Sequence, residues 1–278
     1  MKRLALLLAC LPVAACAADW DAPQQAFALY GGSYYVGPQG VSSVLITSPA
    51  GHILIDGGTP KSPQQIATHI GALGFKIKDI KYILTSHEHF DHAGGIAELQ
   101  RLSGATVLTS ARAKPVLESG KADKGDPQFG DLPDMAPVAK VRAVADGEIV
   151  TLGALAVKAH YTPGHTQGGM SWTWTATEGN RTLNMVYADS LNAFGAGSFR
   201  YSGSASYPHA KRDVEQSIAR VAALPCDILV TAHPEASALF ERQAKGKAAL
   251  VDPAACRNYA DAGRARLAQT LAQEAEKR

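Results

Sequence analysis

Short runs of apolar, often β-branched residues are separated by turn residues along most of the chain, which is the pattern of strands. The first two runs, residues 41–46 and 52–55, flank Pro49, Ala50 and Gly51 and predict a hairpin. Further strands are expected over residues 82–85, 106–108, 141–144, 148–152, 155–160, 169–174, 183–188 and 227–230.

Apolar residues at helical spacing lie between these strands. Ser62 is suited to begin a helix that Gly74 ends, and helices are expected over residues 62–73, 95–103, 111–119, 209–223, 237–243 and 253–273. Residues 120–139 carry repeated Gly and Pro and predict a long functional or mobile loop. Strands followed by helices occur twice, which predicts two packed β-sheets with helices outside and no interdomain linker.

The chain begins with the features of a secretory signal peptide. Lys2 and Arg3 precede an apolar stretch that is too short to span a bilayer, and small residues follow up to Ala17. We therefore expect residues 1–17 to be a signal peptide and residues 18–278 to form a single domain in the periplasm, with no stable membrane span. An alternative is a lipobox ending at Cys16, which would leave a lipid anchor on that residue.

Composition narrows the class of protein. Hydrophobic residues make up 46% of the chain and charged residues 19%, which is typical of a globular protein and not of a disordered one. There are 27 Lys and Arg against 25 Asp and Glu, and removal of Lys2 and Arg3 would balance the charges. No basic face stands out, so we expect no nucleic-acid partner.

Two cysteines remain after removal of the signal peptide, and export to an oxidising compartment favours a bond between them. Loss of the signal peptide removes Cys10, and Cys16 is either removed or lipidated. An even pair in an exported protein predicts one disulfide between Cys226 and Cys256. Two buried free thiols are the alternative.

Three histidines and an aspartate lie within six positions, directly after an expected strand and before an expected helix: His87, His89, Asp91 and His92. Imidazole and carboxylate groups are good zinc ligands. His87 and His89 are two positions apart, so both can face one side of an extended segment. Asp91 and His92 follow the bend and are placed to serve an adjacent site.

Two further histidines each follow an expected strand. His165 lies in a turn after residues 155–160, and His233 follows residues 227–230. Ligand sites collect at the mouths of sheets, so beside the first cluster we expect both histidines to bind metal. The remaining histidines are isolated and are expected to be structural or exposed.

The motif His-x-His-x-Asp-His with Ala-Gly-Gly, a later Pro-Gly-His-Thr, and a final His after a strand resemble the metallo-β-lactamase superfamily over residues 25–277. The resemblance implies an α/β fold, a four-layer αβ/βα sandwich with a metal site at one edge between the sheets. Residues 163–172 and 187–193, His233-Pro234-Glu235 and the cysteine pair look like subclass B3 β-lactamases. Asp189-Ser190 also fits, since other lactamases have Cys there.

The resemblance implies a two-zinc β-lactamase that confers antibiotic resistance, most simply as a monomer. Its substrates would be small-molecule penicillins, cephalosporins and carbapenems, with no preference indicated, attacked by a zinc-bound hydroxide. The implied ligands are His87, His89 and His165 at the first zinc and Asp91, His92 and His233 at the second. Asp91 would orient the attacking water, and Ser190 would hydrogen-bond a water on the second zinc.

Substrate contacts are expected from Ser190, Asn192, Gln128 and Phe129, with Tyr34 and Tyr35 on the opposite wall. The alternatives are a plain turn serine at position 190 and ordinary core packing of the aromatic residues. Asn192 is a departure, because some B3 members have a serine there that is thought to hold the substrate carboxylate. Asp56 and Asp189 are expected to accept the spare N–H of liganding histidines, with turn capping as the alternative.

Two other functions remain open at this point. An exported two-zinc thioester or lactone hydrolase of the same superfamily would use Asp189 to bridge the metals. A non-catalytic zinc-binding protein would keep the fold and the ligands without turnover.

Overall fold

The computed structural model describes residues 19–276. The signal peptide predicted for residues 1–17, with Cys10 and the alternative lipid anchor at Cys16, lies outside the described residues. Within residues 19–276, no helix combines the length and the apolar character needed to cross a bilayer.

Two sheets form the centre of the molecule. The first has seven strands in sequence order: β1 (Phe27–Tyr30), β2 (Ser33–Tyr35), β3 (Val44–Ser48), β4 (Gly51–Ile55), β5 (Ile80–Leu84), β6 (Thr106–Ser110) and β7 (Val141–Val144). The second has the order β12-β11-β10-β9-β8, made of β8 (Ile149–Leu152), β9 (Leu155–Tyr161), β10 (Met170–Glu178), β11 (Arg181–Ala188) and β12 (Ile228–Thr231). Strands β4 to β7 run parallel, as do β11 and β12.

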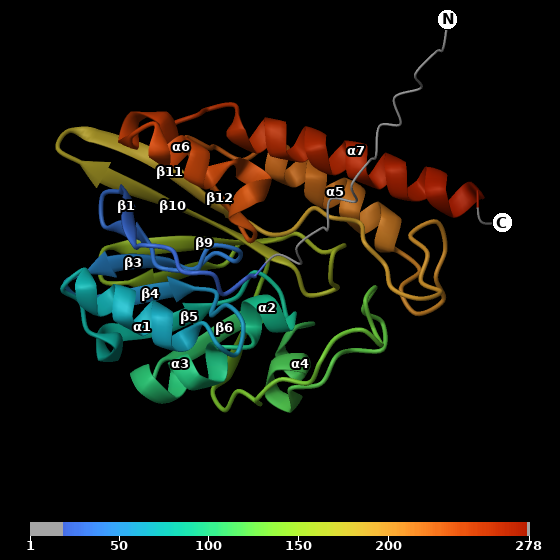
Figure 1. Ribbon diagram of the computed structural model, residues 1–278, viewed down its shortest axis with the longest axis horizontal. Helices are drawn as coiled ribbons and strands as arrows, with labels where there is room; N and C mark the ends of the chain where they lie inside the picture. Colours follow the sequence, from blue (N-terminus) through green and yellow to red (C-terminus); the bar gives the residue numbers. More distant parts are fainter. Residues whose placement is uncertain (1–18, 277–278) are drawn as a thin grey trace, which may run out of the picture.

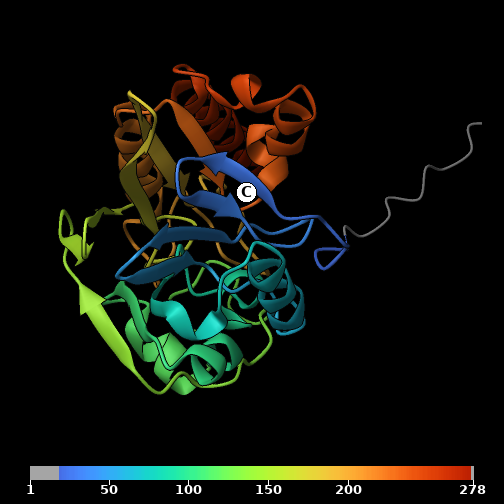
Figure 2. The ribbon, with the colours of Figure 1, turned by 90° about the vertical axis from the view of Figure 1, so that its left-hand side faces the viewer.

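Helices cover the outer face of each sheet (Figures 1 and 2). Their bounds are α1 (Pro63–Ala72), α2 (Phe90–Ala93), α3 (Ile96–Ser103), α4 (Lys114–Ser119), α5 (Ala210–Ala222), α6 (Leu239–Ala244) and α7 (Ala255–Glu276), with 3-10 turns η1 (Ile77–Asp79), η2 (Pro234–Ser237) and η3 (Lys247–Leu250). Helices α1 and α3 lie on the first sheet, and α5 and α7 lie on the second (Figure 1).

Side-chain alternation explains the layers. In β4, Ile53 and Ile55 belong to the core between the sheets, whereas Leu54 packs with the helices outside. In β11, Tyr187 faces the core between the sheets and Val186 packs with α5 and α7. Successive residues of a strand point to opposite faces, so a strand with all residues buried must lie between two apolar layers. The four-layer sandwich expected from the sequence is therefore confirmed.

The expected strands and helices are all present, with ends that differ by a few residues, and β3 and β4 form the expected antiparallel hairpin. Residues 120–140 contain neither helix nor strand. Two strands and one α-helix were missed, namely β1, β2 and α2, as were the short 3-10 turns η1 and η3. Strands β1 and β2 are short and surround Gly31 and Gly32, and α2 has four residues, so none offers enough length for a periodic pattern.

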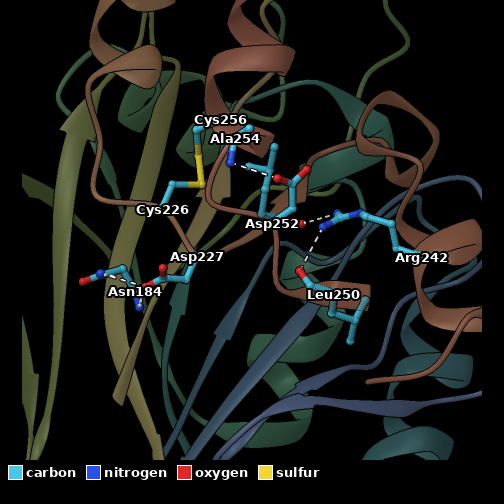
Figure 3. The surroundings of a disulfide bond; sticks show 9 residues. Asn184, Cys226, Asp227, Arg242, Leu250, Asp252, Ala254 and Cys256 are labelled. Carbon is cyan, nitrogen blue, oxygen red and sulfur yellow. Dashed lines mark hydrogen bonds between the residues drawn. A yellow bond between two sulfur atoms is a disulfide. The ribbon is translucent and has the colours of Figure 1, made fainter. Parts of the chain in front are cut away.

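The predicted disulfide is present and joins β12 to α7. Cys226 lies just before β12, Cys256 lies in the first turn of α7, and they are separated by 30 residues (Figure 3). Neighbouring contacts fix the same region: the carboxylate of Asp227 accepts the backbone and side-chain N–H of Asn184, at 2.7 and 2.9 Å. The start of α7 is thus anchored to the second sheet, and the helix runs from there past the site described below.

Candidate metal centre

Six predicted ligands converge where strands of both sheets end. His87, His89, Asp91 and His92 follow β5, His165 lies between β9 and β10, and His233 follows β12. Loops at the ends of strands are held by the sheets beneath them, which gives such side chains a rigid base.

The bend after β5 separates the first cluster into two pairs. His89 is the last extended residue, with φ −74° and ψ 154°, and it directly precedes α2. Asp91 and His92 lie in the single turn of α2 and are buried. Because the backbone changes from extended to helical at His89, the residues after the bend point to a different place from those before it.

The first group consists of His87, His89 and His165. One ligand atom from each residue lies within 4.8 Å of the others, and all three side chains are buried. The ring centroids are 4.8 to 4.9 Å apart, and the rings stand at steep angles to one another. Three imidazole nitrogens around one point match a three-ligand metal site.

The second group consists of Asp91, His92 and His233. His92 Nε2 lies 3.1 Å and His233 Nε2 lies 3.4 Å from Asp91 Oδ2, and the two nitrogens are 3.2 Å apart. The ring of His92 is 4.2 Å from that of His87, so the groups are adjacent. His87, Asp91 and His92 also form a donor set of their own, within 4.8 Å.

In the first group, the imidazoles of His87 and His89 each have one nitrogen that is hydrogen-bonded to a carboxylate; we call it the outer nitrogen. His87 Nδ1 lies 2.8 Å from Asp189 Oδ1, and His89 Nε2 lies 3.0 Å from Asp126 Oδ2. A carboxylate accepts the N–H of a neutral imidazole, which leaves the other ring nitrogen free as a metal ligand.

Two backbone carbonyls do the same for other histidines. His165 Nδ1 donates to the Asn192 carbonyl at 2.9 Å, and His233 Nδ1 donates to the Gly40 carbonyl at 3.0 Å. A carbonyl can only accept, so both rings have the proton on Nδ1 and a free Nε2 turned toward the centre.

The inner atoms fit a metal. His87 Nε2 is buried and has no hydrogen-bond partner among residues 19–276. Burial and neighbouring His92 hold the pKa of His87 well below its usual value, and burial together with His89 lowers the pKa of His165 to about 3. Both rings are therefore neutral near pH 7, which is the form that binds metal.

In the second group, neighbouring carboxylates shift the pKa of His92 upward, in the opposite direction to the shifts in the first group. Although burial lowers it, the carboxylates of Asp91 and Asp56 raise the pKa of His92 to about 10. Although burial raises it, His92 and His233 hold the pKa of Asp91 well below its usual range. Asp91 is therefore ionised, and its negative charge favours a cation in the second group, either a proton on His92 or a metal ion that displaces this proton.

Asp56 supports this side of the site from the end of β4. Its carboxylate accepts the backbone N–H and the hydroxyl of Ser86, both at 2.6 Å, and the hydroxyl of Tyr187 at 2.7 Å. His92 Nδ1 lies 3.6 Å away. Asp56 has φ 60°, an uncommon conformation for a residue other than glycine. The buried network keeps the loop after β5 in place.

Two of the four residues predicted to contact substrate line a cavity beside the metal centre, and the other two do not. Ser190 and Asn192 line a cavity of about 190 Å³ that His165 and His233 also line. Gln128 Nε2 lies 3.5 Å from His89 Nδ1, at the limit of a hydrogen bond. Phe129 is 49% exposed and does not line this cavity.

Tyr34 and Tyr35 do not form a wall of the site, and the core positions expected as the alternative are confirmed. The Tyr35 ring stacks on Phe27 in the core between the sheets, and Tyr34 packs on Phe75 under the helices. Adjacent residues of β2 point to opposite faces, and neither face leads to the metal centre.

Sequence reasoning missed several residues that the fold brings to the site. Asp126 lies in the long loop that was expected to be functional, but no local pattern distinguishes it from the other acidic residues there. Trp20 has its ring 5.9 Å from that of His233, and Tyr259 and Arg266 reach the cavity from α7. For Tyr259 and Arg266, the helical spacing of residues 253–273 predicted a helix but gave no sign of a place at the site.

Comparison with known proteins gives a consistent result. A sequence model of the metallo-β-lactamase superfamily matches residues 36–178, just over half of the chain. The chain is similar to a crystal structure of MEM-A1, a subclass B3 metallo-β-lactamase from a soil metagenome library, with 62% identity and a TM-score of 0.93 over 94% of this chain and 100% of that one. It is also similar to the metallo-β-lactamase SMB-1, with 50% identity and a TM-score of 0.89 over 92% and 99%.

Curated relatives are more distant. A hydroxyacylglutathione hydrolase of Pseudomonas paraeruginosa is 32% identical over 148 residues, which are 53% of this chain and 45% of that protein. The human hydroxyacylglutathione hydrolase-like protein is 28% identical over 173 residues, 62% of this chain and 48% of that protein. The chain thus spans about half the length of the curated relatives it matches.

Proposed function

The chain belongs to the metallo-β-lactamase superfamily, and from this membership we propose that it is a subclass B3-like β-lactamase that opens the amide bond of β-lactam antibiotics. The site would hold two zinc ions. His87, His89 and His165 would bind the first, and Asp91, His92 and His233 would bind the second.

The observation that carries this proposal is the place of Asp189. Its Oδ1 atom lies on the outer nitrogen of His87, so it supports a ligand from behind. It is absent from both donor sets of the metal centre. A thioester hydrolase of this superfamily would need the same aspartate between the metals. The B3 relatives at 50 to 62% identity support the same choice over the hydroxyacylglutathione hydrolases.

Bound zinc supplies Lewis-acid polarisation of the lactam carbonyl and activates water as a nucleophile near neutral pH. The protein contributes orientation. Asp189 and Asp126 fix the rings of His87 and His89, so both ligand atoms are in place before substrate arrives. Asp91, held ionised by its histidine neighbours, can accept a hydrogen bond from the attacking water and orient it.

Other residues shape the space in which the substrate reacts. Ser190 lines the cavity together with Asn192, and we expect its hydroxyl to donate to a water or to substrate. Trp20 lies against Phe90 and His233 and shields one side of the second group from solvent. Exclusion of water strengthens the electrostatic interactions in the site.

The test is a joint measurement of zinc content and turnover on purified protein. We expect about two zinc ions per chain, with hydrolysis of a penicillin, a cephalosporin and a carbapenem and little hydrolysis of a glutathione thioester or a lactone. Clavulanate-type inhibitors should have no effect, because they acylate a nucleophilic serine. Preferential thioester turnover, or zinc binding without any hydrolysis, would contradict the proposal.

We also propose that the mature protein works in the periplasm and protects the cell from β-lactams. The Cys226–Cys256 disulfide supports this, since disulfides persist in oxidising compartments. Fractionation of expressing cells, with the mass of the mature protein, tests the location and distinguishes cleavage after residue 17 from lipidation of Cys16. Recovery of full-length protein in the cytoplasm would contradict this part.

A further inference from the structure

One face of α7 runs along the loop that carries Ser190 and Asn192. Tyr259, Gly263 and Arg266 are spaced by four and three residues, so they share a face of the helix. Both Tyr259 and Arg266 line the cavity beside the metal centre. The helix therefore forms a wall of the candidate substrate site.

Direct contacts hold this wall in place. The Tyr259 hydroxyl donates to the Asp189 carbonyl at 2.9 Å and accepts the Leu191 N–H at 3.1 Å. Further along, the Thr270 hydroxyl donates to the Ala193 carbonyl at 2.8 Å. The helix is thus fixed to the loop on both sides of Arg266.

Gly263 allows this close approach. A Cβ atom at this position would lie 3.0 Å from the Cβ of Leu191, which is tighter than ordinary van der Waals contact. The backbone of α7 can therefore lie close against the loop, and the next residue on this face toward its C-terminus is Arg266.

Arg266 is a cation without a fixed partner. It is exposed, and its guanidinium forms no hydrogen bond or ion pair with any residue from 19 to 276. By contrast Arg264, two positions earlier, forms an ion pair with Asp261 on the same helix. A free guanidinium beside a polar cavity has five N–H donors available for a planar anion.

We propose that Arg266 binds the carboxylate of the β-lactam substrate and so determines the preference for anionic substrates. This inference rests on the proposed function. Antibiotics of this class carry a carboxylate on the ring fused to the lactam, and an arginine can engage it through two parallel hydrogen bonds. Asn192 lines the same cavity, and a side-chain amide has N–H donors that suit a carboxylate.

The cavity also contains a negative charge that Arg266 can offset. Glu235 also lines the cavity, is exposed and forms no ion pair within the described chain. Its negative charge disfavours an anionic substrate. Arg266 is the arginine among the residues that line the cavity, and its positive charge offsets that of Glu235.

The test compares a penicillin with its uncharged methyl ester in steady-state kinetics of the zinc-loaded enzyme. In Arg266→Ala, KM for the free acid should rise about fivefold with little change in kcat, while KM for the ester should change less than about twofold. Arg266→Lys should recover part of the loss, and Arg266→Glu should lose more than Arg266→Ala. The inhibition constant of the hydrolysed acid, measured as a competitive inhibitor, should rise in parallel with KM.

Arg264→Ala is the matched control, because it removes the same charge from the same helix away from the cavity. It should leave both substrates unaffected. Equal effects of Arg266→Ala on acid and ester, or equal effects of the two alanine variants, would overturn the assignment of Arg266. A wild type that hydrolyses neither acid nor ester would show instead that the proposed function is wrong.

Discussion

Replacing Asp189 with alanine removes the carboxylate that accepts the Nδ1 proton of His87. Asp189 is fully buried, and its Oδ1 atom lies 2.8 Å from that nitrogen. In the variant this buried N–H loses its shorter hydrogen bond and keeps only the longer contact with the Ser86 hydroxyl at 3.3 Å, and a lost buried hydrogen bond of this kind costs about 1 to 3 kcal/mol. The backbone contacts of residue 189 with Ser171 and Tyr259 do not depend on the side chain and remain.

The metal-bound state needs the proton on Nδ1 and the ring in this orientation, so the lost hydrogen bond weakens metal binding. We expect about 10- to 100-fold weaker zinc affinity at the first site, which corresponds to about 1.4 to 2.7 kcal/mol. At saturating zinc the content should stay near two ions per chain, while competition with a chromophoric chelator reveals the weaker site. Asp189→Asn should lose less, since an amide oxygen can still accept from His87.

Ser190→Ala is the companion variant. It should keep both affinities and lose about tenfold in activity, because the hydroxyl contacts water or substrate and not metal. Complete loss of zinc from folded Asp189→Ala at saturating zinc, with full retention in Ser190→Ala, would refute this reasoning. Asp189 would then bridge the metals, as the thioester-hydrolase alternative requires.

Three further outcomes are expected. Removal of the metal with a chelator should abolish hydrolysis and lower the melting temperature, because metal binds only the folded state; calorimetry with and without zinc tests this, and full activity in metal-free protein would contradict it. Cys226→Ser should lower the unfolding free energy by roughly 3 kcal/mol for a loop of 30 residues, measured by urea denaturation against the parent. Burial, with Lys158 and Arg220, lowers the pKa of His160 to about 4. Its neutral form is favoured in the folded state, so stability is present above the unfolded pKa of about 6.5 and is lost as the pH falls from there toward 4. The variant His160→Gln can keep the hydrogen bond to Thr173 but does not titrate. Between about pH 7 and about pH 5 its free energy of unfolding should fall by about 1 kcal/mol less than that of the parent, a figure reduced for the partial exposure of His160. The same fall of unfolding free energy with pH in both proteins would exclude this role of His160.

Local patterns were sufficient for most of the fold. The apolar run of residues 52–55 beside a turn and the helical spacing in residues 209–223 are short-range patterns, so both elements are visible in the sequence and appear as β4 and α5. Short elements such as α2 escaped, because four residues contain too little of a helical period.

The metal-binding motif was also a local feature, because His87, His89, Asp91 and His92 lie on one segment. His165 and His233 could be added because each follows a strand. The structure brings the six residues together, and their binding of zinc stays a prediction.

Only the tertiary structure decided which groups stand behind the ligands and which face the substrate. Asp126 meets His89 across 37 positions, and Asp189 meets His87 across 102. Arg266 reaches the cavity because α7 is fixed against the loop of residues 189–193 by contacts such as that of Tyr259 with Asp189. Such pairings depend on how sheets and helices pack at long range, whereas the sequence pattern reports only the period and the capping of each element by itself.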